Sequence, residues 1–181
     1  MNIREWIADN IGYKFGGCAY AKTHDRIFNP IQKLIPKDFL GRKVSDLGCG
    51  DCSNTLRIKK LFQVKDIVGF ERNPYLIQRA RNKGLKVKKL DLNDSIPKGE
   101  LATFSFALHH IKDKVNMLQQ VKRNFKYIFL IEPMKDLYHA LFDAGYPLSE
   151  KDWIKVFDEA LGEYQLHKQG NNLIVFYRSK S

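Results

Sequence analysis

The order of short apolar segments and helical patterns after residue 42 constrains the fold of this chain more than any other feature. Apolar runs of strand length alternate there with segments whose apolar residues recur at helical spacing. This alternation is typical of βαβ units built around a parallel sheet. We expect five strands in this part of the chain, at residues 44–47, 67–70, 85–90, 101–106 and 127–131.

The end of the chain follows a different pattern. Ser149 suits the start of a helix that reaches about residue 161, because Asp152 follows three residues later. Two further strands are expected at 164–167 and 173–177. The segment between them is too short for a crossover helix, so this pair must be antiparallel.

Length and local pattern together predict one domain. A chain of 181 residues suits a single hydrophobic core. We expect residues 42–181 to form that core and residues 1–41 to form a helical N-terminal segment. Two helices are expected in the latter, around residues 3–11 and 28–35, with a break at Gly16-Gly17.

The overall charge and the lack of long apolar runs bear on location and partners. The net charge of +11 is compatible with a nucleic acid, an anionic membrane or an acidic protein as partner. The basic residues are spread along the chain, so a solvated lysine-rich surface is the plainer interpretation. No apolar run is long enough to cross a bilayer, and residues 1–10 lack the apolar core of a signal peptide. We therefore expect a cytoplasmic protein without a membrane span.

Two of the three cysteines, Cys49 and Cys52, form a C-x-x-C pattern. The simpler interpretation is that two small side chains fill a tight glycine turn. The alternative is a redox pair or one half of a zinc site. No second Cys/His pair at ligand spacing completes a zinc set, so packing is favoured and no metal is predicted.

The segment from Val44 to Gly50 carries the first sign of a ligand. Asp46 stands near the end of the first expected strand, two residues before the Gly48-Cys49-Gly50 turn. Glycines there allow the backbone to approach a ligand closely, and the turn leads into a helix N-terminus that attracts an anion. Because Asp46 adds a negative charge, the site suits a zwitterion such as an amino acid end group.

Two more acids follow the next two strands. Glu71 ends the second strand, where a carboxylate can accept both hydroxyls of a ribose. Dinucleotide-binding folds also place an acid there, but their third glycine is replaced here by Ser53. Asp91 follows the third strand and is either a turn residue or an acceptor for an adenine amino group, with the N–H of Leu92 as donor to the ring. Ligands bind outside the carboxyl ends of parallel strands, which favours the second role.

These motifs resemble those of class I S-adenosylmethionine-dependent methyltransferases. Residues 46–50, Asp-Leu-Gly-Cys-Gly, are similar to that family's first motif, and Glu71 and Asp91 match its next two acids. Residues 100–111, which include Leu-His-His, resemble its fourth motif. The similarity runs from about 42 to 178 and includes the terminal hairpin.

The resemblance implies a fold and a cofactor. The fold would be a Rossmann-like seven-stranded, mostly parallel sheet in the order 3-2-1-4-5-7-6, with strand seven antiparallel, helices on both faces and an N-terminal helical lid. The cofactor would be S-adenosylmethionine, with its methionine part at the first motif, its ribose at Glu71 and its adenine at Asp91. The residues expected to bind it are Asp46, Gly48, Cys49, Gly50, Glu71, Arg72, Asp91, Leu92 and Phe106.

Three residues are candidates for a role at the methyl group. His109 and His110 follow the fourth strand, and an imidazole there could take a proton from the acceptor, cap the next helix or position the substrate. Tyr20 lies in the segment that often covers the cofactor in this family, and is otherwise a half-buried surface aromatic. Glu132 and residues 138–139 are expected on the substrate side.

The sequence departs from the family in ways that narrow the chemistry. There is no glycine turn before strand five. The Asn/Asp-Pro-Pro-aromatic motif of enzymes that methylate planar nitrogens is absent, and so is the cysteine of cytosine-C5 enzymes. Three functions stay open: in-line methyl transfer to an O, N or C nucleophile of a small molecule, an RNA or protein methyltransferase, and a non-catalytic cofactor-binding partner subunit.

Overall fold

A computed structural model describes residues 17–136 and 145–180, with side chains from residue 24 onward. Seven strands form one sheet in the order β3-β2-β1-β4-β5-β7-β6. Strand β7 is antiparallel to both β5 and β6, and the other neighbouring pairs are parallel. The predicted fold class and strand order are therefore confirmed.

The strands are β1 (Val44–Leu47), β2 (Ile67–Glu71), β3 (Val87–Lys89), β4 (Gly99–Ser105), β5 (Phe125–Pro133), β6 (Gln165–Gln169) and β7 (Asn172–Arg178). The described helices are α3 (Gly17–Ile31), α4 (Ser53–Leu61), α5 (Pro74–Asn82), α6 (Lys114–Asn124) and α8 (Glu150–Leu161), with short 3-10 helices η2 (Lys37–Phe39) and η3 (Leu108–His110).

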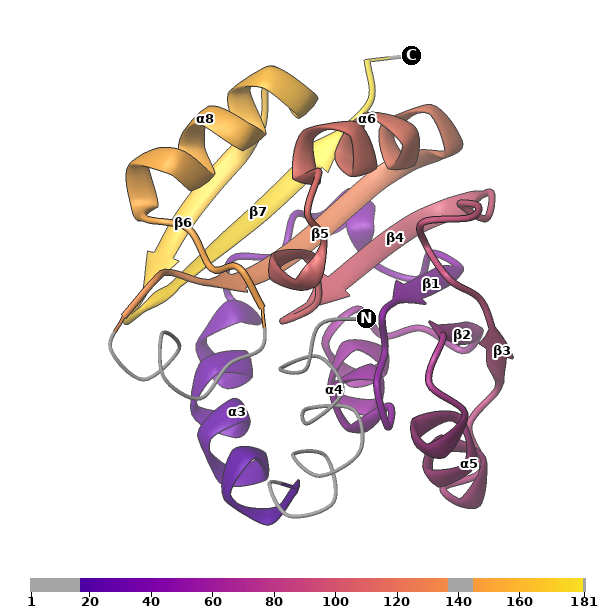
Figure 1. Ribbon diagram of the computed structural model, residues 1–181. Coiled ribbons are helices and arrows are strands. Elements are labelled where there is room, and N and C mark those ends of the chain that lie inside the picture. Colours follow the sequence, from indigo (N-terminus) through magenta and orange to yellow (C-terminus); the bar gives the residue numbers. More distant parts are fainter. Residues whose placement is uncertain (1–16, 137–144, 181) are drawn as a thin grey trace.

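Helices cover both faces of the sheet, as Figure 1 shows. Helices α6 and α8 lie on one face, and α3, α4 and α5 lie on the other. Alternate residues of each central strand serve the two faces, because successive side chains of a strand point in opposite directions. In β5, Ile128 and Leu130 pack toward α6 and α8, whereas Phe129 and Ile131 pack toward α3 and α4.

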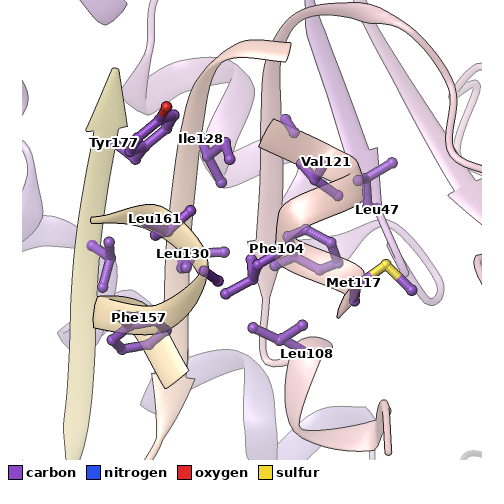
Figure 2. Packing of buried hydrophobic residues seen from close by; sticks show 14 of the residues in the cluster. Leu47, Phe104, Leu108, Met117, Val121, Ile128, Leu130, Phe157, Leu161 and Tyr177 are labelled. Carbon is purple, nitrogen blue, oxygen red and sulfur yellow. The ribbon is translucent and has the colours of Figure 1, made fainter. Parts of the chain in front are cut away.

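The core under α6 and α8 is continuous (Figure 2). Met117 and Val121 of α6 and Phe157 of α8 lie against Phe104 and Leu130 of the sheet, and all five side chains are buried. This packing fixes the positions of β4 and β5, whose carboxyl ends carry the loops described below.

Three helices, α5, α6 and α8, begin with a side-chain cap. Asn73 accepts the N–H of Tyr75 at 2.9 Å at the start of α5, and Ser149 accepts the N–H of Asp152 at 3.2 Å at the start of α8. Asp113 caps α6 in the same way. The caps end the loops sharply, so the carboxyl edge of the sheet is bordered by helix N-termini.

Some element boundaries differ from the sequence-based expectation. Helix α3 begins at Gly17, where a break was expected, and ends at Ile31 although the expected helix continued to residue 35. Strand β5 starts at Phe125 directly after α6, because the helix passes into the strand without a glycine turn. The helix expected around residues 3–11 lies outside the described residues. Within the described residues, no helix is both long and apolar enough to span a membrane.

Candidate active site

The turn after β1 uses left-handed backbone conformations. Gly48, Gly50 and Cys52 have φ values of 68°, 57° and 60°. A Cβ added to Gly48 would lie 2.9 Å from Cβ of Ala107, so this turn touches the loop after β4. A Cβ added to Gly50 would have no described atom within 4 Å. The glycine motif thus leaves open space on one side of the turn and makes a close contact on the other.

Asp46 lies beneath this turn and is 1% exposed. Its two carboxylate oxygens accept hydrogen bonds from the hydroxyls of Thr55, at 2.5 Å, and Thr103, at 2.7 Å. Burial raises the pKa of Asp46 to about 6, opposed by these two hydrogen bonds and reinforced by the nearby charge of Glu71. A cation above the turn would stabilise the ionised carboxylate of Asp46 against the effects of burial and of the charge of Glu71.

Glu71, at the end of β2, connects the second motif to the first. One carboxylate oxygen accepts the N–H of Gly50 at 2.9 Å, and the other accepts the N–H groups of Arg72 and Asn73 at 2.8 Å each. These bonds fix the orientation of the carboxylate beside the glycine turn. A carboxylate has about four acceptor sites, so Glu71 retains capacity for a ligand hydroxyl.

Asp91 lies one strand further along the sheet edge. It accepts two hydrogen bonds from Asn93, at 2.9 Å from the backbone and 2.8 Å from the side chain, which is the turn role considered above. Arg72 lies 3.9 Å away as an exposed ion-pair partner. Leu92 is buried beneath this loop. Arg72 therefore links Glu71, which accepts its backbone N–H, to Asp91, which lies beside its side chain.

Asp51 attaches the glycine turn to α5, because it pairs with two basic residues near the end of that helix. Asp51 forms ion pairs with Lys83 at 2.7 Å and Arg79 at 3.3 Å. Burial opposes ionisation of Asp51, but the hydrogen bonds from Lys83 and Ser53 outweigh it and the pKa of Asp51 is lowered. Lys83 also donates to the Ser53 hydroxyl at 2.7 Å. The start of α4 is thereby tied to the end of α5.

The loop after β4 is held by Glu132, which is 0% exposed at the end of β5. Its carboxylate accepts the N–H groups of Ala107, Leu108 and His109 at 3.0, 2.8 and 3.1 Å. It also lies 2.7 Å from Nδ1 of His109. Since a carboxylate only accepts, Nδ1 carries the hydrogen in this bond.

The two histidines of the fourth motif occupy different environments. His109 is 2% exposed and directed at Glu132, whereas His110 is exposed. Their ring centroids lie 4.1 Å apart. The N–H of Tyr146 donates to the carbonyl of His109 at 2.7 Å, so the segment before α8 lies beside this loop.

Phe106 adopts a φ of 58°, which is rare for a bulky residue. Its ring stacks on the ring of His24 in α3, with centroids 4.6 Å apart. His24 Nδ1 lies 2.9 Å from Oδ1 of Asn54 in α4. Burial lowers the pKa of His24. Helix α3 is therefore joined both to the loop after β4 and to the helix that follows the glycine turn.

Comparisons with known proteins agree with this arrangement. Residues 20–174 match the methyltransferase domain family. The chain belongs to this family of S-adenosylmethionine-dependent methyltransferases. No curated protein matches the sequence significantly.

Solved structures of methyltransferases share the fold at low sequence identity. Human N-acetylserotonin methyltransferase in complex with S-adenosylmethionine has a TM-score of 0.71 at 16% identity, over 90% of this chain and 54% of that one. A possible histamine N-methyltransferase from Thermotoga maritima has a TM-score of 0.74 at 13% identity, over 96% of this chain and 99% of that one.

Magnesium protoporphyrin IX methyltransferase from Synechocystis, with bound S-adenosylhomocysteine, has a TM-score of 0.69 at 14% identity, over 98% of each chain. The present chain spans about half the length of the human enzyme. At identities of 13–16% the likeness to these proteins concerns the fold.

The residues of this chain fit the family's cofactor. Two carboxylates, Asp46 and Glu71, lie close enough for the charge of one to raise the pKa of the other. S-adenosylmethionine brings an ammonium and a sulfonium, which such a pair attracts. The open space at Gly50 permits close approach to the turn. The Oγ atom of Ser105, at the end of β4, is buried and has no hydrogen-bond partner in the described part of the chain.

The sequence-predicted residues separate into three groups in the structure. Those of the first and second motifs lie together around the turn: Asp46, Gly48, Cys49, Gly50 and Glu71. Arg72, Asp91 and Leu92 continue along the same sheet edge, and Phe106 joins the turn through its neighbour Ala107. The side chain of Tyr20 and residues 138–139 lie outside the described part of the chain.

The sequence did not indicate the roles of Thr55 and Thr103, nor that Glu132 holds the loop after β4. The two threonines occur in a helix and a strand without any motif, so only the fold reveals that they meet at Asp46. Glu132 was expected on the substrate side, but its carboxylate is directed at the backbone of the loop after β4. The run of apolar residues before it in β5 could have indicated that this acid is buried.

Proposed function

We propose that this methyltransferase transfers a methyl group in line to an O, N or C nucleophile of a small molecule. The observation that carries the proposal is the position of the charged residues. Although the basic residues are spread along the chain, six of them are close in sequence on α5, on β3 and between the two, at the Asp91 end of the sheet: Arg79, Arg81, Lys83, Lys86, Lys88 and Lys89. These six residues are called the basic cluster. The end of β4 is bordered by His110 and Tyr146, and the ammonium of the buried Lys114 lies 5.8 Å from the centre of the Tyr146 ring.

The basic cluster is a weak argument for a nucleic-acid substrate in this chain. Lys83 and Arg79 are engaged by Asp51, and Arg72 lies beside Asp91. Lys88 and Lys89 are exposed on β3, which is an edge strand, and lysines at such positions discourage edge-to-edge pairing of sheets. The net charge of +11 keeps an RNA or protein acceptor as the alternative.

The names of the similar structures also favour a small acceptor. N-acetylserotonin, histamine and magnesium protoporphyrin IX are the acceptors in the names of the three methyltransferases compared above. Their low identity conveys fold rather than specificity, so they support the class of acceptor and not its structure.

We assign roles to the residues of this chain as follows. Asp46 supplies negative charge from beneath the turn, and the N–H groups at the start of α4 favour the carboxylate of the methionine part. Glu71 would accept a ribose hydroxyl at its remaining acceptor site, and Asp91 with the N–H of Leu92 would hold the adenine. Arg72, Cys49 and Phe106 would border the cofactor. When bound, S-adenosylmethionine supplies an activated methyl group on a sulfonium.

The remaining task of the protein is to align the acceptor and exclude water. We assign His109 to positioning, because it is buried against Glu132. His110 is the candidate base for an acceptor that arrives protonated. We further propose that residues 1–41, with Tyr20, form a lid of the single domain and that residues 133–150 complete the acceptor site.

The test is incubation of the full chain with S-adenosylmethionine carrying a labelled methyl group, together with separated RNA, protein and metabolite fractions of cells. Label in the metabolite fraction supports the proposal. Label in RNA that declines with added salt, or label in protein, supports the alternative. Cofactor binding without transfer to any fraction would instead indicate a partner subunit.

The role of His110 has its own test once an acceptor is known. Replacement of a general base lowers kcat by about 100-fold or more, with little change in KM. His110→Ala should show this pattern if the acceptor is protonated. The half-buried His167 of β6 offers a control, because His167→Ala removes an imidazole far from β4 in the sheet order.

A further inference from the structure

The thiols of Cys49 and Cys52 lie against each other within the cofactor turn. Their Sγ atoms are 3.0 Å apart, and both cysteines are free. The backbone already brings them together, because the N–H of Cys52 donates to the carbonyl of Cys49 at 2.9 Å. A disulfide bond is about 2.05 Å long, so bond formation requires the sulfurs to approach by only about 1 Å.

Strand β2 provides room for this pair at a single position. A Cβ added to Gly69 would lie 2.6 Å from Sγ of Cys49 and 2.9 Å from Sγ of Cys52. Any other residue at this position would displace one of the sulfurs. The glycine therefore accommodates two sulfurs in contact, which is a more specific arrangement than the filling of a turn by small side chains.

The position of Cys52 favours an ionised sulfur. Cys52 is the N-cap residue of α4, and a helix N-terminus stabilises a thiolate. Its hydrogen bond with Cys49 lowers the pKa of Cys52 and raises the pKa of Cys49. Cys52 is 0% exposed, whereas Cys49 is partly exposed. An external reagent therefore meets Cys49 first.

We propose that Cys49 and Cys52 form a reversible dithiol–disulfide site that is oxidised by a small-molecule disulfide and that, once oxidised, binds S-adenosylmethionine more weakly. The inference rests on the cofactor of the family and not on the class of acceptor proposed above. It makes the cofactor turn a modification site as well as a binding site.

The chemical step balances with one molecule of oxidant. Cys49 loses its proton and attacks the external disulfide, which leaves a mixed disulfide on Cys49 and releases one thiolate that takes up the proton of Cys49. Cys52 then attacks Sγ of Cys49 and expels the second thiolate, which takes up the proton of Cys52. Two protein thiols are oxidised to one disulfide, and the external disulfide is reduced to two thiols.

Oxidation is expected to disturb the cofactor through Gly50. This residue lies between the two cysteines, and its N–H is the donor that holds the carboxylate of Glu71 at 2.9 Å. Drawing the sulfurs together moves the backbone of the turn on which that hydrogen bond and the open space at Gly50 depend. Coupling between two sites is typically 5- to 150-fold, and we expect about a 10-fold loss of affinity.

The first experiment measures the bond itself. The full chain is equilibrated in glutathione redox buffers, the thiols are then blocked, and peptides are analysed by mass. The expected product is a peptide containing residues 49 and 52 that has lost two hydrogens, both in the wild type and in Cys18→Ser, which lacks the third cysteine of the chain. Cys52→Ser should form only a glutathione adduct. An unmodified pair in oxidising buffer, or a bond that involves Cys18, would overturn the proposal.

The second experiment measures the coupling to the cofactor by calorimetry with S-adenosylhomocysteine. The reduced chain should bind it about 10-fold more tightly than the oxidised chain, and a reductant should restore the affinity. Cys49→Ser leaves only the buried thiol of Cys52 in the turn, so its affinity, whatever its value, should be the same in both buffers. Equal affinity of the reduced and oxidised wild type would contradict the inference. A reduced chain that binds no cofactor would contradict the cofactor role of the turn instead.

Discussion

Glu132 and His109 form a buried pair in which one carboxylate organises the whole loop after β4. The carboxylate lies 2.7 Å from Nδ1 of His109 and also accepts three consecutive backbone N–H groups. Strand β5 thereby sets the conformation of the loop that touches the glycine turn through Ala107. The end of β5 therefore supports the contact between the loop after β4 and the glycine turn after β1.

Glu132→Gln should destabilise the protein, because an amide offers one acceptor oxygen where the loop presents four donors. An unpaired buried donor costs about 1–3 kcal/mol, so we expect the free energy of unfolding to fall by about 2–4 kcal/mol. Urea unfolding measures it. The exposed Glu159 of α8 is the matched control, and Glu159→Gln should change stability by less than about 0.5 kcal/mol. Equal effects of the two substitutions would refute the role of Glu132.

Gly48→Ala should be far more damaging than Gly41→Ala. Both glycines have similar φ values, 68° and 70°, and so carry a similar conformational penalty of about 1–2 kcal/mol for alanine. Only at Gly48 does the new Cβ also meet a neighbour, Cβ of Ala107 at 2.9 Å. Overpacking adds about 1–3 kcal/mol. Urea unfolding should therefore show losses of about 1–2 kcal/mol for Gly41→Ala and about 3 kcal/mol or more for Gly48→Ala; similar losses would argue against the contact.

The strands and the cofactor turn were predictable because their signals are local. The run Val44–Leu47 and the glycines after it specify a strand and a turn within a few residues, and β1 has the expected bounds. The hairpin of β6 and β7 followed from the length of one loop. The order of all seven strands came from the resemblance to a family, since pairing between distant strands leaves no mark in the local pattern.

The contacts that hold the site were not predictable, because they join distant residues. Thr103 reaches Asp46 across 57 positions of sequence, and Glu132 reaches His109 across 23. The left-handed conformation of Phe106 is also invisible in the sequence, where glycine is the usual sign of positive φ. The start of α3 was also missed, because Gly17, which was expected to break a helix, stands at the first position of one.

Cofactor affinity should depend on the ionisation of Asp46. Its pKa is raised to about 6, mainly by burial, so in the folded protein it becomes protonated as the pH falls below that value. If the ammonium of the cofactor is held by the charged form, the Kd for S-adenosylhomocysteine should rise by up to about 10-fold per pH unit below pH 6. Calorimetry at pH 5 and pH 7.5 measures this.

Asp46→Asn is the control for that dependence. The amide keeps the shape but not the charge, so binding should be weak at both pH values and the slope should vanish. The free energy of unfolding should depend on pH in the opposite direction to cofactor affinity, falling where the affinity rises. A raised pKa means that the folded state holds the proton more tightly, so stability falls as the pH rises from about 4 to 6 and the ionised carboxylate is destabilising above that window. Asp46→Asn should therefore unfold at higher urea concentration at pH 7.5. A variant that keeps the wild-type pH slope of binding would exclude Asp46 as its source.

Acid should weaken the attachment of α3 through His24. Burial lowers the pKa of this imidazole, so the folded state favours the neutral ring stacked on Phe106. The unfolded chain then binds more protons than the folded chain just below the ordinary pKa of about 6.5, and stability contributed by neutral His24 is lost as the pH falls through this range. His24→Phe keeps an aromatic ring for the stack but cannot titrate. The difference in unfolding free energy between wild type and His24→Phe, measured at pH 7.5 and 5.5, should shift in favour of the variant at the lower pH. Because Asp46 is present in both proteins, its opposite contribution cancels in this difference. An unchanged difference would show that protonation of His24 does not act on the fold.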